Sequence, residues 1–181
     1  TLNVAKGEAS RAMETVRVAA EEAKRVGGEI VPIDWTEAGE GRLGMVRRFP
    51  LGPVLGIAPF NYPLNLSCHK LAPAIAAGNS FILKPASATP LSGLILGELV
   101  LEAGFPPEAL SVVTCRGSKA EKLVADPRIA YFTFTGSSEV GWHLKSVSDA
   151  LGRFRSVRWI STCTGRYDIF AMVAFHNNQA F

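Results

Sequence analysis

Cysteine is scarce in this chain, and the three that occur stand far apart, at Cys68, Cys115 and Cys163. An odd number of isolated cysteines does not suit a disulfide framework, and the spacing offers no Cys-x-x-Cys pair for a metal. We therefore expect a reduced, cytoplasmic protein with buried thiols and without a metal site.

Long apolar runs are also missing, since no stretch reaches the roughly 18–20 residues that a membrane-spanning helix needs. The opening residues, TLNVAKGEASRAME, contain no apolar core of the kind found in a signal peptide. The formal net charge is only +3, and the basic residues are spread along the chain. We therefore expect neither a membrane nor a nucleic acid as a partner.

The sequence does contain enough apolar material for a core, with 48% hydrophobic and 19% charged residues among 181. This composition is typical of a globular protein and suits one domain, or one domain with part of another. Because the first residue is Thr1 rather than Met, we expect the sequence to be a piece of a longer protein.

Between residues 54 and 145, short apolar runs alternate with helical patterns. Strands are expected at 54–58, 80–84, 110–114 and 129–134, and helices at 63–77, 90–104, 118–124 and 137–145. Strands rich in Val, Ile and Phe that alternate with helices predict a parallel sheet covered on both faces. The fold class is therefore α/β with a Rossmann-like open sheet, whose ligands lie at the carboxyl ends of the strands.

The first fifty residues follow other patterns. Apolar residues at helical spacing predict a helix over 8–26, ended by Gly27-Gly28. Short strands at 29–33 and 45–49 enclose a polar loop, and Pro32 limits the first of them to a sheet edge. Further on, Pro73 should bend or break the last turns of its helix.

Three features follow strands and therefore lie where a ligand is expected. Asn61 stands between two prolines, where its amide can stabilise an oxyanion or simply cap the next helix. Lys84 ends a strand, where it can donate to a nucleotide or lie solvated. The turn Thr135-Gly136-Ser137 precedes a helix whose free N–H groups can bind a pyrophosphate, although such a turn is also an ordinary helix cap. Because the Gly-x-Gly-x-x-Gly fingerprint is absent, these residues alone indicate only an α/β protein that binds a nucleotide.

Five motifs stand in a specific order between residues 50 and 141. They are P-x-G-x-x-x-x-x-x-P-x-N-x-P from Pro50 to Pro63, GN with an apolar run and KP from Gly78 to Pro85, TPL at 89–91, AGFPP at 103–107 and FTGSxxxG at 134–141. This series resembles the cofactor-binding domain of the aldehyde dehydrogenase superfamily. Residues 7–12 and the helix after them resemble the segment that precedes this domain. The resemblance covers roughly residues 1–146 and implies a partial NAD(P)-binding domain.

The resemblance implies a role for each matching position. Asn61 matches the oxyanion-stabilising Asn, Lys84 the Lys that binds the adenosine ribose, and Ser137, after Gly136, the Ser that contacts the pyrophosphate. Lys70 matches a Lys near the active site, with structural support as its alternative role. The other matches are a wall against the cofactor, formed by Ile57, Ala58, Pro59 and Phe60, and a glycine near the adenine, Gly117.

Ser87 bears on the choice between NAD and NADP. NAD-preferring members of the family often have Glu three residues after the Lys, where the carboxylate pairs with the ribose hydroxyls and repels a 2′-phosphate. Serine removes that charge and supplies a hydroxyl, so the resemblance implies NADP, with NAD as the alternative. It also implies a small aldehyde as substrate, and a dimer or tetramer of the complete enzyme.

Two parts of the family's machinery are missing from the sequence. The reaction needs a nucleophilic cysteine and a glutamate in an ELGG-type motif, and neither follows residue 146. Cys163 lies in a different setting, and we interpret its role as structural or incidental. Residues 147–181 contain no Lys or Glu but four of the twelve arginines, so a frameshift, an alternative end or a truncated gene model is expected there.

Two classes of function remain open. The chain is either part of an NAD(P)-dependent enzyme that oxidises an aldehyde to a carboxylic acid, inactive by itself, or a non-catalytic module that binds a dinucleotide or a partner. A relative that reduces an acyl phosphate or an acyl-CoA is disfavoured by Asn61 and the KPAS sequence at Lys84.

Overall fold

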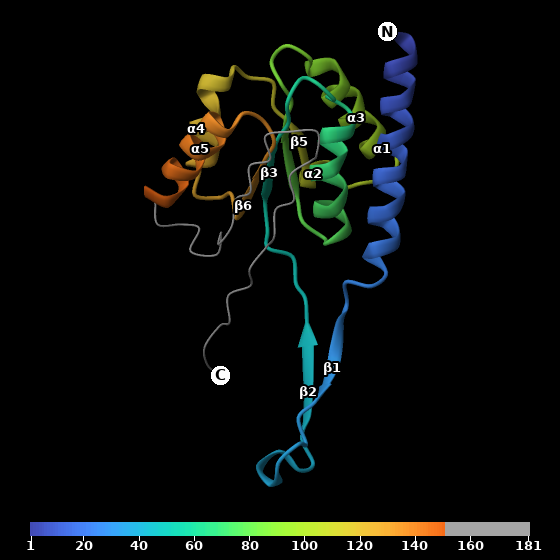
Figure 1. Ribbon diagram of the computed structural model, residues 1–181, viewed down its shortest axis with the longest axis vertical. Helices are drawn as coiled ribbons and strands as arrows, with labels where there is room; N and C mark the ends of the chain where they lie inside the picture. Colours follow the sequence, from blue (N-terminus) through green and yellow to red (C-terminus); the bar gives the residue numbers. More distant parts are fainter. Residues whose placement is uncertain (151–181) are drawn as a thin grey trace.

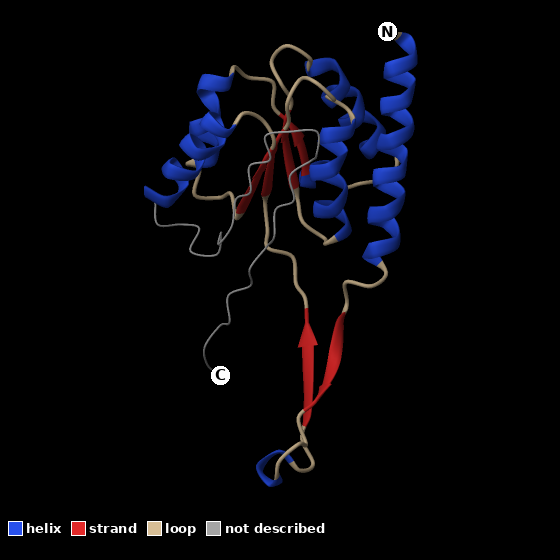
Figure 2. Cartoon of the chain, viewed as in Figure 1, coloured by secondary structure: helices blue, strands red, loops and turns tan. Residues whose placement is uncertain are grey.

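The computed structural model describes residues 1–150 and contains two separate sheets. A parallel sheet with helices on both faces forms the body, and an antiparallel hairpin projects from it (Figures 1 and 2). The expected α/β class with an open parallel sheet is confirmed.

The parallel sheet consists of β3 (Val54–Ile57), β4 (Phe81–Lys84), β5 (Leu110–Val112) and β6 (Tyr131–Phe134) in the order β5-β4-β3-β6. The strands β4 and β5 lie on one side of β3, whereas β6 lies on the other side. The strand order therefore reverses between β3 and β6. Open α/β sheets bind their ligands outside the carboxyl ends of the strands at such a point.

Each face of the sheet has its own apolar core, because neighbouring residues of a strand point to opposite faces. Val54, Phe81 and Leu83 pack with α2 (Asn65–Ala76) and α3 (Pro90–Glu102) on one face. Leu55 and Phe132 pack on the other with α4 (Ala120–Val124) and α5 (Ser138–Ala150). The long helix α1 (Leu2–Ala23) lies along α2 on the outside of the first layer (Figure 1). Residues 1–150 also contain three short 3₁₀ helices, η1 (Glu37–Gly39), η2 (Pro107–Ala109) and η3 (Gly117–Lys119).

Glycine lets α2 approach the sheet closely. A Cβ atom on Gly56 in β3 would lie 2.3 Å from the Phe81 ring and 3.2 Å from Cβ of Lys70 on α2. Gly56 is buried, so a larger residue there would have to push the helix or the ring away. This close approach brings Lys70 down to the sheet.

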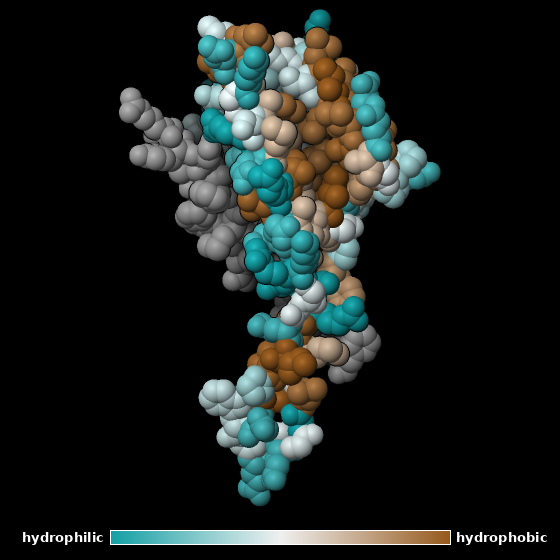
Figure 3. Space-filling model, turned by 90° about the vertical axis from the view of Figure 1, so that its right-hand side faces the viewer, coloured by the Kyte–Doolittle hydropathy of each residue, from teal (hydrophilic) through white to brown (hydrophobic). Residues whose placement is uncertain are grey.

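The outer faces of the molecule keep much apolar surface exposed. On α3, Leu91, Ile95 and Leu99 are exposed, and Figure 3 shows apolar surface on the helical side of the body and on the hairpin. Exposed apolar surface of this kind is a candidate for an interaction site.

The N-terminal helix begins and ends earlier than the expected range of 8–26. It spans Leu2–Ala23, and Gly28 takes part in the hairpin rather than in the helix end. Gly28 has φ +127°, and a Cβ atom there would lie 2.0 Å from the carbonyl oxygen of Val46. The second glycine is therefore needed for strand pairing, which the local helix pattern could not reveal.

The hairpin itself agrees with the expected pair of strands. β1 (Gly28–Pro32) pairs antiparallel with β2 (Leu43–Arg47), and Pro32 stands at the end of its strand opposite Leu43. Proline is tolerated there because both strands are edges of a two-stranded sheet.

The sequence predicted that Pro73 would bend or break the last turns of its helix, but the helix is not broken there. α2 continues for three residues beyond Pro73 and ends at Ala76, followed by Gly78 with φ +78°. Most of the helix is buried against α1 and the sheet, and tertiary packing of this kind outweighs one lost backbone hydrogen bond.

Within residues 1–150, no helix is both long and apolar enough to cross a membrane. The same residues contain no group of three or more His, Cys, Asp or Glu side chains arranged to hold a metal ion.

Candidate functional site

The residues that follow β3, β4 and β6 leave the sheet at one edge. Ile57 pairs in register with both Lys84 and Phe134. Beyond that row, the Ala58 N–H donates to the Lys84 carbonyl at 3.0 Å, and the Thr135 N–H donates to the Ile57 carbonyl at 3.1 Å. The candidate residues of these three loops therefore meet at the carboxyl edge, around the β3–β6 switch point.

Asn61 lies in the exposed turn after β3, and its side chain makes no hydrogen bond to any other residue of the described chain. The helix cap that we weighed as its alternative role is wrong, because α2 has Leu64 at its N-cap position. The amide of Asn61 is thus available to a ligand at the mouth of the sheet.

Glu8 of α1 supplies the acceptor that α2 needs at its start. Its Oε1 accepts the backbone N–H groups of Leu64 at 2.7 Å and of Asn65 at 3.0 Å. The first N–H groups of a helix have no partner within the helix, so a carboxylate there stabilises them. Sequence reasoning missed this residue, since no local signal connects positions that are 56 residues apart.

Lys84 is buried, with 3% of its surface exposed, so the solvated alternative is wrong. Its Nζ donates to the Pro85 carbonyl at 3.1 Å, and the structure gives it no other acceptor within residues 1–150. An ammonium group has three donors. A buried cation with spare donors at the mouth of the sheet fits the hydroxyl groups of a ribose.

Ser87 joins the loops that follow β4 and β5. Its hydroxyl donates to the Cys115 carbonyl at 2.9 Å, which brings the segment before Gly117 beside it. Gly117 is exposed at the start of η3, and a Cβ atom there would meet nothing within 4 Å. Open space therefore lies over this turn, as a bound adenosine requires.

On the other side of β3, Gly136 and Ser137 are exposed and directly precede α5. The first backbone N–H groups of a 13-residue helix suit a pyrophosphate. Gly136 also has a structural reason within the chain, because its Cβ would lie 2.4 Å from Cζ of Phe134. The Phe134 ring therefore leaves no room for a side chain at position 136, which favours glycine there independently of any ligand.

The four positions expected to form a wall against a cofactor differ in exposure. Ile57 and Ala58 are buried in the two cores, whereas Phe60 is 67% exposed and Pro59 is half-buried. Of the four residues, only Pro59 and Phe60 present their side chains beyond the sheet. The contact of these four residues with a cofactor stays a prediction.

Lys70 reaches the same edge from α2. Its Nζ donates to Oγ1 of Thr135, and only 5% of the residue is exposed. Burial lowers the pKa of Lys70 from 10.5 to about 8, because the charged form loses its hydration. A lysine with such a pKa can exchange a proton near neutral pH.

Of the two cysteines within residues 1–150, Cys68 does not have the properties of a nucleophile. Cys68 is 2% exposed in the core, and burial, with a smaller contribution from Glu8, raises its thiol pKa to about 11. Cys115 is half-buried, with its backbone carbonyl bonded to Ser87. Cys163 lies outside the described residues.

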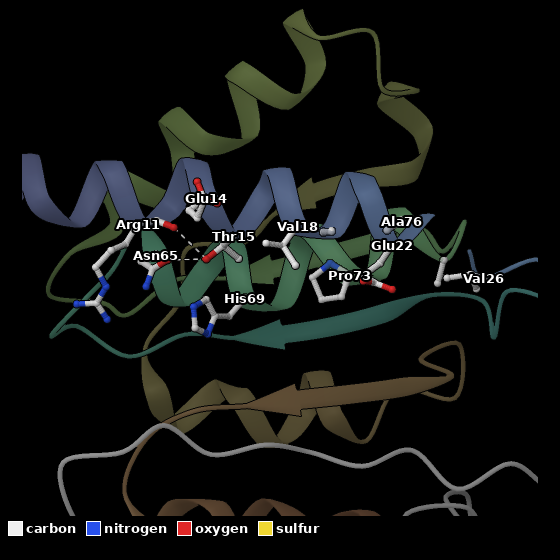
Figure 4. A pocket seen from close by; sticks show the side chains of 12 residues that line it. Arg11, Glu14, Thr15, Val18, Glu22, Val26, Asn65, His69, Pro73 and Ala76 are labelled. Carbon is white, nitrogen blue, oxygen red and sulfur yellow. Dashed lines mark hydrogen bonds between the residues drawn. The ribbon is translucent and has the colours of Figure 1, made fainter. Parts of the chain in front are cut away.

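A groove runs between α1 and α2 and is lined mainly by side chains of these two helices (Figure 4). Its volume is about 570 Å³. At one end the guanidinium of Arg11 lies 5.1 Å from the centre of the Tyr62 ring, and Thr15 Oγ1 lies 3.0 Å from Asn65 Oδ1. Tyr62, which stacks with Arg11, is the residue that follows Asn61 in the sequence.

Comparison with known proteins finds one matching family and many relatives. The model of the aldehyde dehydrogenase family matches residues 1–157. The 3-sulfolactaldehyde dehydrogenase of Priestia aryabhattai is 46% identical over 147 residues, which cover 81% of this chain and 31% of that protein.

Two solved structures resemble the chain closely. Aldehyde dehydrogenase 21 from Physcomitrella patens, in complex with the reaction product succinate, has a TM-score of 0.77 and 44% identity, covering 82% of this chain and 31% of that one. NADP-dependent glyceraldehyde-3-phosphate dehydrogenase from Bacillus halodurans, complexed with NADP, has a TM-score of 0.76 and 40% identity, covering 81% and 31%. The chain thus spans about a third of the length of these relatives.

Proposed function

The chain belongs to the aldehyde dehydrogenase family, and from this premise we propose that it forms the cofactor-binding part of an NAD(P)-dependent enzyme that oxidises an aldehyde to a carboxylic acid. One observation supports this most directly: Lys84 ends one strand, and Asn61 and Ser137 follow two neighbouring strands at the same edge of the sheet. They stand on both sides of the β3–β6 switch point.

Each of these residues would perform a task that its position allows. A bound NAD(P)⁺ would supply the nicotinamide ring that accepts hydride from the substrate. Buried Lys84 would donate to ribose hydroxyls, and the first N–H groups of α5 would bind the pyrophosphate. Asn61 would donate to the aldehyde oxygen as negative charge develops there, a contact that can lower a barrier by about 3 kcal/mol.

Ser87 leads us to propose NADP rather than NAD as the preferred cofactor. No carboxylate occurs between Lys84 and Glu98 in the sequence, so a 2′-phosphate meets no repulsion from this loop. We expect Ser87→Glu to weaken NADP binding at least tenfold, since two like charges would then face each other at short range. Unchanged NADP binding in this variant, together with tighter binding of NAD than of NADP by the wild type, would refute the preference.

The proposal is tested with the chain itself. Isothermal titration calorimetry with NADP and NAD should show binding, whereas absorbance at 340 nm should show no turnover of short aldehydes. Absence of dinucleotide binding by a folded chain would refute the proposal. Turnover that Cys163→Ser abolishes would overturn our interpretation of Cys163 as structural.

A second candidate is a module that binds a dinucleotide without catalysis. The observation in its favour is that Cys68 is buried with a raised pKa, so this thiol is not activated. Both candidates predict binding by this chain and no turnover by it alone. They differ in a full-length protein that carries this segment, where the first candidate predicts aldehyde turnover that Asn61→Ala lowers by the 100- to 1,000-fold that loss of an oxyanion donor costs, and the second predicts no turnover.

The substrate that we propose is a small aldehyde with an anionic group. The three relatives above are named for, or bound to, molecules that carry a sulfonate, a carboxylate or a phosphate. Arg11 supports the same class here, because it stacks on Tyr62 next to Asn61. Titration with succinate, followed by NMR, should shift signals of Tyr62 and Asn65 in the wild type and leave them unchanged in Arg11→Gln. Equal shifts in both proteins would contradict this assignment.

A further inference from the structure

We propose that Arg116 and Lys119 hold the 2′-phosphate of NADP, an inference that rests on the proposed cofactor function. Both residues lie between β5 and α4, at the edge of the sheet that carries Lys84 and Ser87. The motifs of the sequence point to Ser87 and Gly117 but to neither of these two cations.

The backbone places both residues close to Ser87. The Ser87 hydroxyl donates to the carbonyl of Cys115 at 2.9 Å, and Arg116 is the next residue along the chain. The Lys119 N–H donates to the Arg116 carbonyl at 2.9 Å, so a tight turn keeps the two cations together. Long, flexible side chains on this turn can reach a group bound over Ser87.

Both cations are available to a ligand. Arg116 and Lys119 are exposed, and neither side chain forms an ion pair or a hydrogen bond with another residue in the range 1–150. Other arginines of the chain are engaged, such as Arg128, which pairs with Asp126 at 2.7 Å. A phosphate would therefore not have to displace an existing partner from Arg116 or Lys119.

The local charge favours an anion. Segment 116–122 contains three cations and a single carboxylate, that of Glu121. Glu121 lies 2.8 Å from the His143 ring on α5, so its side chain is directed toward that helix. The exposed cations of this turn, with Lys84 buried beneath the neighbouring loop, therefore favour a group of roughly −2 charge.

The position on the sheet distinguishes the 2′-phosphate from the pyrophosphate. The pyrophosphate is expected at the start of α5, beyond β3 on the side of β6. Ser87 and Lys84 stand on the other side, where the adenosine ribose is expected. A cation pair beside Ser87 therefore faces the 2′ position of that ribose, and the planar guanidinium of arginine suits a phosphate monoester.

The experiment measures the binding of two probes that differ only in the 2′-phosphate. Adenosine 2′,5′-diphosphate and adenosine 5′-monophosphate are titrated into the full 181-residue chain by calorimetry. The variants are Arg116→Gln and Lys119→Gln, and Arg42→Gln in the exposed connection of the hairpin serves as a matched control. Circular dichroism checks that each variant is folded.

We expect Arg116→Gln to weaken binding of the 2′,5′-diphosphate about tenfold, since a charge-assisted contact is lost. Lys119→Gln should weaken binding of the 2′,5′-diphosphate about threefold, because the loss of one exposed charge costs little free energy. Binding of the 5′-monophosphate should change less than twofold in both, and Arg42→Gln should alter neither probe.

An equal loss for both probes, or no loss for either, would overturn the inference while leaving the cofactor proposal intact. A wild-type chain that is folded but binds neither probe would refute the cofactor proposal and this inference with it. Both substitutions lie on an exposed turn. If one variant does not fold, the other variant still tests the inference.

Discussion

Burial of Lys70 couples its protonation to the stability of the fold. The pKa of Lys70 is about 8 in the folded chain and 10.5 for an ordinary lysine. Between these values the unfolded chain binds the proton and the folded chain does not, so stability rises with pH across this window. Below pH 8 both states are charged, and the folded state carries the full cost of the buried ammonium.

The first prediction follows from that coupling. We expect the difference in unfolding free energy between wild type and Lys70→Met to shift by about 3 kcal/mol in favour of the wild type from pH 8 to pH 10.5. Urea denaturation at several pH values measures this shift. The exposed Lys6→Met serves as a control and should show no such dependence. A constant difference across the window would contradict the lowered pKa.

A second prediction at this scale concerns the thiols. Native chain treated with iodoacetamide at pH 7.5 should remain unmodified at Cys68, because its pKa is about 11 and only 2% of it is exposed. Peptide mass spectrometry should find Cys68 labelled only after urea is added. Labelling of Cys68 in native chain as fast as in urea would show that α2 is not packed as described.

At the scale of the element, α2 depends on α1 for its first turn. Removal of the Glu8 carboxylate leaves the N–H groups of Leu64 and Asn65 without their acceptor. We expect Glu8→Ala to cost about 1–2 kcal/mol of stability, the usual range for a lost helix cap. Hydrogen exchange should accelerate at residues 64 and 65 first. Glu14→Ala, which removes only an exposed pair with Arg17, should cost less than about 0.5 kcal/mol.

The contact between α2 and β3 gives the next prediction. Gly56→Ala forces a Cβ atom into the space of Phe81 and Lys70, and overpacking of this kind costs about 1–3 kcal/mol. The midpoint of urea unfolding should fall accordingly. Gly7→Ala on exposed α1, where a Cβ meets nothing within 4 Å, should leave stability equal or higher because alanine favours the helix. A neutral Gly56→Ala would mean that β3 and α2 are further apart.

At the scale of the whole molecule, the chain presents apolar surface on α3 and on the hairpin. We expect it to associate at micromolar concentration, since exposed apolar surfaces of two chains can bury one another. Light scattering with Ile95→Lys and Leu99→Lys, both at exposed positions of α3, should give a lower mass than the wild type. If both variants keep the mass of the wild type, α3 does not carry the association.

The sequence by itself determined the element order, the parallel sheet and most candidate positions, because these depend on patterns within short segments. Short apolar runs, helical spacing and glycine or proline at segment ends are local properties of the chain. The strands around Leu55 and Leu83 and the loops with Asn61 and Lys84 were therefore expected from residues near one another. The end of α1 was misplaced because Gly28 is needed by β2, a partner outside the local pattern.

Only the tertiary structure decided which residues meet across long separations. The carboxylate of Glu8 at the start of α2, the bond from Lys70 to Thr135 and the approach of Ser87 to Cys115 join residues 56, 65 and 28 positions apart. Burial likewise belongs to the whole fold: it makes Lys84 a sheltered donor and lowers the pKa of Lys70. Hydration lost by a charged group depends on every element packed around it, so no short stretch of sequence can reveal it.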